Sequence, residues 1–221
     1  MRNKFSHEDR QWDTNFFAQG SFKKDFKPWY SLLVNAKYAY DYLHYLADPN
    51  KDESLMYTNN HYYQQEAYLS AANRFTIFPW WEVNLSADWQ FNLLNADLRD
   101  FVYPRRHTLL AAAATAMRFD RVEIQASLLG TLVHDRTKGD RMSDKRKLTP
   151  AVFLSWRPFE RAGINIRAFY KRMFRMPTFN DLYYTDMGNA FLKPEYAEQF
   201  NVGLKYARDF ERSPFMRMLD V

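Results

Sequence analysis

The sequence predicts an antiparallel, up-and-down transmembrane β-barrel. Three observations favour it: long segments with period-two hydropathy, connections that alternate between short and long, and an aromatic content of 18%. In residues 81–93, every odd position from Trp81 to Leu93 is apolar and every even position from Glu82 to Asn92 is polar. Because strand side chains alternate between two faces, this segment has one apolar and one polar face. It exceeds the about 5–6 residues usual for soluble strands and the about 9–11 tilted residues that cross a bilayer.

We predict four strands in the first half of the chain, each with an apolar face that would contact lipid. They are residues 15–26 with Phe16 and Phe22 on that face, 29–44 with Leu32 and Val34, 61–78 with Leu69 and Ile77, and 81–93 with Val83 and Trp89.

Six further strands are predicted in the second half. The segment 106–118 is ambiguous, because its run of alanines does not indicate which face is apolar. A tenth strand is expected to begin near Phe215. The other four are 122–133 with Ile124 and Leu128 on the apolar face, 147–156 with Val152 and Leu154, 163–173 with Ile164 and Ile166, and 196–207 with Phe200 and Val202.

The connections support the same fold, because short and long ones alternate. The short ones are 27–28, 79–80, 119–121, 157–162 and 208–214, and the long ones are 45–60, 94–105, 134–146 and 174–195. Tight turns on one side and long loops on the other are typical of outer-membrane barrels. Proline is confined to connections and strand ends, because a proline inside a strand would remove a backbone hydrogen-bond donor from the ladder. Pro150 is the exception.

Composition excludes several other classes of protein. No apolar stretch approaches the about 20 residues of a membrane helix, and the absence of cysteine excludes disulfides and thiolate metal sites. The net charge of +5 is spread along the chain, so we expect no nucleic-acid partner. The N-terminus has no apolar signal-peptide region, so an exported protein would have to be a piece of a longer chain.

Nothing in the sequence predicts catalysis. The five histidines show no metal-ligand spacing, and there is no nucleophile elbow or phosphate loop. His44 and His61 flank one long loop and could face each other across a strand pair. We therefore expect no enzyme, no catalytic residue, no metal site and no cofactor.

The long connection 174–195 reads FRMPTFNDLYYTDMGNAFLKPE, and it resembles a stretch of the TonB-dependent outer-membrane receptors. Those proteins carry R-x-P, then L-Y, then G-N-x-x-L-x-P-E leading into a barrel strand. The matching positions are Arg175, Pro177, Leu182, Tyr183, Gly188, Asn189, Leu192, Pro194 and Glu195.

The resemblance implies a Gram-negative outer-membrane receptor with a barrel of roughly 22 strands, closed by an N-terminal plug. Residues 1–221 would then be a partial barrel domain of about ten strands, with the plug absent. The implied partners are outer-membrane lipid, a small metal-chelate ligand and, through the missing plug, the TonB energy-coupling complex. The implied function is active uptake of a scarce nutrient.

Two groups of site residues follow. Candidate ligand contacts in the loop are Arg175, Asn180, Tyr183, Tyr184, Asp186 and Asn189, and candidate lumen-facing residues are Glu82, Asn84, Asp88, Arg167, Asn201 and Lys205. The four residues 174–177 resemble a box of the haem receptors, but no histidine lies in the loop after them. Ferric siderophores, haem and cobalamin therefore stay open as substrates.

Two alternatives belong to other classes. A self-contained ten-stranded outer-membrane barrel with surface hydrolase activity would need its first strand to pair with the strand near Phe215, and an acid–base cluster above the rim. A soluble β-rich ligand-binding module would bury Val83, Leu85 and Trp89 beneath a second layer and would dissolve without detergent.

Overall fold

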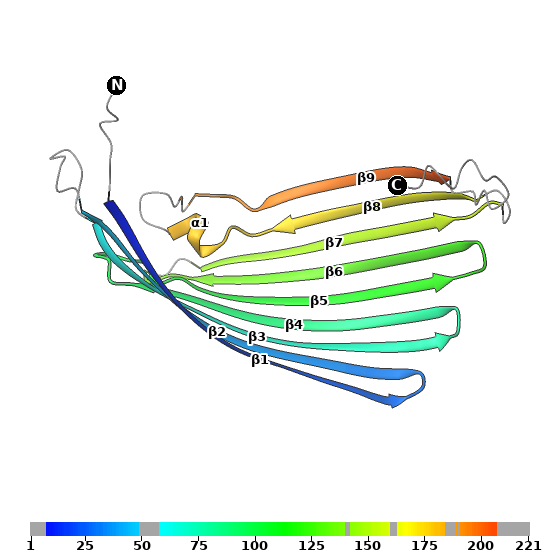
Figure 1. Cartoon of the computed structure of the whole chain (residues 1–221), viewed down its shortest axis with the longest axis horizontal. Helices are drawn as coiled ribbons and strands as arrows, with labels where there is room; N and C mark the ends of the chain where they lie inside the picture. The colour runs from blue at the N-terminus through cyan, green and yellow to red at the C-terminus, as the bar shows by residue number, and fades with distance from the viewer. Residues whose placement is uncertain are drawn as a thin grey trace, which may run out of the picture.

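A computed structural model describes residues 8–48, 58–139, 142–159, 163–183, 189 and 191–206. Their nine strands form one antiparallel sheet in which the spatial order follows the chain (Figure 1). The elements are β1 (Glu8–Lys27), β2 (Tyr30–Asp48), β3 (Thr58–Phe78), β4 (Trp81–Ala96), β5 (Arg105–Arg118), β6 (Val122–Arg136), β7 (Met142–Trp156), β8 (Ile164–Arg175), α1 (Phe179–Tyr183) and β9 (Glu195–Tyr206).

The first nine predicted strands are confirmed, and most of them extend beyond the residues that the hydropathy pattern predicted. β1 begins at Glu8 rather than residue 15, because its polar first third pairs with β2 out to Glu8↔Asp48. The ambiguous alanine segment is β5, which pairs over its whole length with β6. The tenth strand predicted near Phe215 lies outside the described residues.

The register assigns each side chain to one of two faces. One face carries unbroken apolar rows, such as Leu69 beside Trp89, Leu109 and Leu132 on successive strands. These four side chains are 40–50% exposed, and no second layer covers them in the described part of the chain. The neighbouring row on the opposite face contains Ser70, Asp88 and Thr131. We call these two surfaces the apolar face and the polar face.

Short turns and long loops are segregated at opposite ends of the sheet, as predicted (Figure 1). Aromatic rings gather at the short-turn end: Trp80 stacks on Phe78 at 5.3 Å and on Phe119 at 5.3 Å. The Trp81 indole Nε1 donates a 2.8 Å hydrogen bond to Thr115 Oγ1. Amphipathic rings of this kind are enriched where a membrane barrel meets the lipid–water boundary.

The sheet is not uniform, because β7 and β8 separate toward the long-loop end. β7 pairs with β6 out to Met142, but its ladder with β8 ends at Ala151↔Lys171. The next residue of β7 is Pro150, which has no N–H to donate. Pro150, the exception to the proline pattern in the sequence, thus marks the point where the β7–β8 ladder ends.

No helix in the described residues is long and apolar enough to cross a membrane. α1 is the one helix in those residues and has five residues. It packs on the polar face at the long-loop end, where Phe179 joins Tyr62, Leu94 and Ala96 in a buried cluster. The buried hydrophobic cluster of the described residues therefore lies beneath α1.

Candidate ligand-binding site

The β8–β9 loop folds over the polar face because its first turn is fixed by the local sequence. The Asp181 amide donates to Thr178 Oγ1 at 3.2 Å, and the Thr178 amide donates to Asp181 Oδ2 at 2.8 Å. This reciprocal arrangement is a capping box, which starts α1 at Phe179. Phe179 and Leu182 are then buried, with 6% and 8% of their surfaces exposed.

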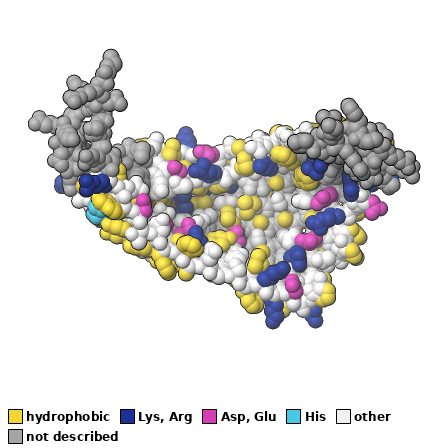
Figure 2. Space-filling view, in the orientation of Figure 1, with side chains coloured by type: hydrophobic (Ala, Val, Ile, Leu, Met, Phe, Trp, Pro, Cys, Tyr) yellow, Lys and Arg dark blue, Asp and Glu magenta, His cyan; other side chains and the backbone are white. Residues whose placement is uncertain are grey.

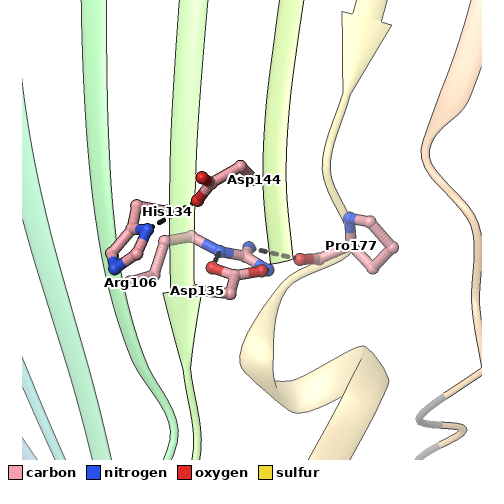
Figure 3. Close-up of polar contacts among 5 residues, drawn as sticks. All are labelled: Arg106, His134, Asp135, Asp144 and Pro177. Atoms are coloured by element: carbon pink, nitrogen blue, oxygen red, sulfur yellow. Dashed lines mark hydrogen bonds and ion pairs between the residues drawn. The ribbon is translucent and has the colours of Figure 1, made fainter. Parts of the chain in front are cut away.

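Arg106 fastens this loop to the sheet (Figure 3). Its Nε and NH2 atoms donate to the two carboxylate oxygens of Asp135 at 2.6 and 2.9 Å. Its NH1 donates to the Pro177 carbonyl at 2.6 Å, and its guanidinium lies 5.0 Å from the Phe179 ring centre. Because Arg106 is only 7% exposed, these contacts act in a largely dry environment.

Sequence reasoning missed Arg106 and Asp135, although a signal was present. The two residues face each other in the β5–β6 register. That register follows from the tight turn predicted at 119–121, since a hairpin turn fixes which residues oppose each other. The contact with Pro177 could not be inferred, because it joins residues 71 positions apart.

A cavity of about 640 Å³ lies between α1 and the polar face of β1–β4. The residues that line it include three aspartates, Asp13, Asp41 and Asp181, together with Asn180. Gln11 also lines it and donates to Asp13 at 2.9 Å. Across the described residues, no group of three or more His, Asp or Glu side chains is placed to hold a metal ion. The cavity can therefore offer hydrogen-bond acceptors and negative charge to a larger ligand.

The predicted loop residues fall into different environments. Asn180 lines the cavity. Arg175 is exposed and lies 3.8 Å from both Asp181 and Glu195, so it joins the two ends of the loop. Tyr184 and Asp186 lie outside the described residues.

Tyr183 and Asn189 make contacts within the loop. Tyr183 packs against Phe179, and burial, with the nearby Asp135 carboxylate, raises the pKa of its hydroxyl. Asn189 Oδ1 accepts a hydrogen bond from the Phe191 amide at 2.9 Å, and the Asn189 amide donates to the Asp181 carbonyl at 2.8 Å. Both residues therefore shape the loop above the cavity.

The six predicted lumen-facing residues share the polar face but do not converge. Glu82 and Asn84 lie together near the short turns, where Asn84 donates to Glu82 at 3.2 Å. Arg167 and Lys205 line a separate cavity of about 360 Å³ at the same end. Two remain apart from both pairs by register: Asp88 beside Ser70, and Asn201 beside Phe169. Figure 2 likewise shows acidic and basic side chains scattered over the visible surface.

His44 and His61 do face each other across β2 and β3, with ring centres 4.0 Å apart. Trp12 stacks on the other side of His44 at 4.7 Å, and the Tyr42 hydroxyl lies 2.7 Å from His61 Nδ1. The pair belongs to an aromatic stack on the apolar face at the long-loop end, and Tyr42 of this stack also lines the cavity.

Comparisons with known proteins agree with this architecture. A family model described as "TonB dependent receptor-like, beta-barrel" matches residues 2–213. No curated protein sequence matches. Among solved structures, the FrpB iron transporter from Neisseria meningitidis has a TM-score of 0.65 at 13% identity, over 89% of this chain and 34% of that one. The copper transporter OprC has a TM-score of 0.65 at 13% identity, over 92% and 36% of the two chains.

A third similar structure is BauA, the ferric preacinetobactin receptor from Acinetobacter baumannii, with a TM-score of 0.56 at 13% identity over 90% of this chain and 36% of that one. The chain spans about a third of the length of these proteins. At such low identity, similarity to these structures supports the fold alone. The family match, by contrast, covers almost the whole sequence. The chain belongs to the TonB-dependent receptor β-barrel family, whose members are receptors and transporters rather than enzymes.

Proposed function

We propose that this chain forms part of the barrel wall of an outer-membrane receptor that takes up a scarce, metal-containing nutrient. The observation that carries the proposal is the exposed apolar face of the sheet, set opposite a polar face over which a loop is fastened. Lipid is the solvent in which such a face is stable, because a soluble protein would cover it. The family match supports transport as the use of this wall.

The edges of the sheet support a larger barrel. In the described residues β1 pairs only with β2, and β9 only with β8. An unpaired strand edge in lipid leaves backbone donors and acceptors unsatisfied, which costs several kcal/mol per group. We infer that further strands complete the wall, and that a plug inside it couples the receptor to TonB.

The cavity beneath α1 is the proposed point of ligand contact. Its acceptor-rich wall suits a chelate that presents hydrogen-bond donors or positive charge. Asn180 lines this space. Tyr184 and Asp186 stay proposed ligand contacts on the strength of the sequence alone. The named ligands of similar receptors include iron and copper species, so a metal chelate is the substrate class that we propose.

The face assignment is tested with two neighbouring substitutions in the full-length receptor that carries this segment. Leu85 is 44% exposed on the apolar face, and Ser86 lies on the polar face between Ala72 and Ala112. Leu85→Arg places a charge toward lipid, at a cost of roughly 2–4 kcal/mol near the membrane midplane. We expect it to reduce the heat-modifiable, protease-resistant receptor in outer-membrane fractions.

Ser86→Arg is the matched control, because its small neighbours leave room and its face is polar. We expect it to assemble like the parent. Equal assembly of both variants, or a receptor that stays soluble without detergent, would contradict a lipid-facing sheet. Transport is then tested by cell-associated metal after feeding ferric siderophore, haem or cobalamin in turn. Uptake that persists without TonB would contradict the coupled mechanism.

A further inference from the structure

The cavity of about 360 Å³ at the short-turn end of the polar face is lined mainly by basic residues. Its lining comes from the β5–β6 turn, the segment after β7, and the adjoining ends of β8 and β9, which lie together at one end of the sheet (Figure 1). Four cations line it: Arg121, Arg157, Arg167 and Lys205. Asp120 is the one carboxylate among the described lining residues. We call this space the basic cavity.

Two of these cations, Arg167 and Lys205, have no counter-ion in the described part of the chain. Lys205 lies opposite Asn165 in the β8–β9 register, and Arg167 is two residues further along the same face, so the two are diagonal neighbours. Long side chains at such positions reach each other, and like charges there repel. Neither side chain forms an ion pair or hydrogen bond among the described residues, and the Asp120 carboxylate is paired with neither. An anion in the basic cavity would relieve this repulsion.

Hydrogen bonds within the wall hold two further donors of the basic cavity in place. Arg157 donates from its amide to the Arg121 carbonyl at 2.8 Å and from NH2 to the Asp120 carbonyl at 2.9 Å. A guanidinium has five N–H donors, so most of those of Arg157 are left for a ligand. Ser155 Oγ donates to Asn165 Oδ1 at 3.0 Å, which leaves the Asn165 Nδ2 group as a donor. The wall therefore offers positive charge and N–H donors, which suit a ligand made of anionic oxygen atoms.

We propose that the basic cavity binds a small polyanion that carries two or more phosphate or carboxylate groups. Its volume lies within the about 300–1,000 Å³ of ligand pockets, so there is room for more than one anionic group. Arg157 and Arg167 each match two oxygens of such a group, and Lys205 adds a point charge. The site depends on the described wall alone. Its opening toward the periplasm rests on the proposed membrane function, because the short turns of a barrel lie on that side.

The experiment titrates the full-length receptor, in detergent and without divalent cations, with inorganic pyrophosphate and separately with the tricarboxylate tricarballylate, and measures binding by calorimetry. The variant Arg167→Gln/Lys205→Gln removes the two unpaired cations. Since an exposed charge pair contributes up to about fivefold in affinity, we expect roughly 25-fold weaker binding. Binding by the parent should also weaken as salt is added. The matched control Lys23→Gln/Arg74→Gln removes one lysine and one arginine that are exposed on the same face near the short turns of β1 and β3, and it should bind like the parent.

Binding of either probe by the parent, lost in Arg167→Gln/Lys205→Gln, supports the proposal, and the tighter probe identifies the preferred anionic group. Equal affinity in the parent and this variant would overturn it, and a loss of the same size in the control variant would reduce the effect to net charge. An absence of binding in the parent would mean that another part of the receptor fills the cavity. Binding that appears only in Glu160→Gln would assign the cavity to that carboxylate, which lies outside the described residues. A receptor that dissolves without detergent would contradict the membrane function and leave the binding result unaffected.

Discussion

Arg106 offers the sharpest test of how the β8–β9 loop is held over the polar face. The substitution Arg106→Gln removes the charge and shortens the side chain, so the bond to the Pro177 carbonyl and the contact with Phe179 are lost. A hydrogen bond from a charged donor contributes about 1.5–3 kcal/mol, and a cation–π contact about 1. We therefore expect loop docking to weaken by about 3 kcal/mol, or roughly 150-fold.

The assay is hydrogen exchange of the loop in the full-length receptor, followed by mass spectrometry. Two amides report docking: Leu182, which donates to the Thr178 carbonyl at 3.2 Å, and Asn189, which donates to the Asp181 carbonyl at 2.8 Å. Both should exchange much faster in Arg106→Gln. Amides within the β8–β9 ladder, such as those of residues 166–170, should not change.

Arg105→Gln is the matched control, because it makes the same chemical change one residue away on the opposite face. It should leave exchange in the loop at the parental rate. Unchanged exchange in Arg106→Gln, or equal acceleration in both variants, would refute the view that Arg106 fastens the loop.

Two further predictions concern the seam beside β8 and the start of α1. Pro150→Val restores an N–H and should extend the β7–β8 ladder. A disulfide between Thr149→Cys and Met173→Cys should therefore form more readily in this variant than in the parent. The control is a Phe153→Cys/Phe169→Cys pair, which is already opposite in the register and should form a disulfide equally in both. No gain for the first pair would mean that Pro150 does not end the ladder. Hydrogen bonds from Thr178 hold the pKa of Asp181 below its usual 3.8, so its contribution to loop docking is complete above that pH and is lost as the pH falls further. Asp181→Asn should lower loop protection factors at neutral pH and abolish this acid dependence, whereas an unchanged acid dependence would assign it to another group.

The strands could be predicted from the sequence because each strand of a membrane barrel contacts lipid on one face and water on the other, so that apolar and polar residues alternate. Leu69, Trp89 and Leu109 share a face in the register, as alternation alone predicted for the first two. The short turns could also be predicted from the sequence, because proline and aromatic residues occur at and beside them. For β5 the run of alanines did not indicate which face is apolar, and the register with β4 and β6 assigned its side chains to the two faces.

The sequence by itself determined the strands, their faces and the segregation of turns from loops, because these follow from period-two contact with lipid and water and from local turn chemistry. The tertiary structure decided how the β8–β9 loop is used. Its capping box is local, but the contact of Pro177 with Arg106 and the burial of Phe179 against Leu94 join residues far apart in the chain. Such contacts depend on the curvature and register of the whole sheet, and no short stretch of sequence encodes either.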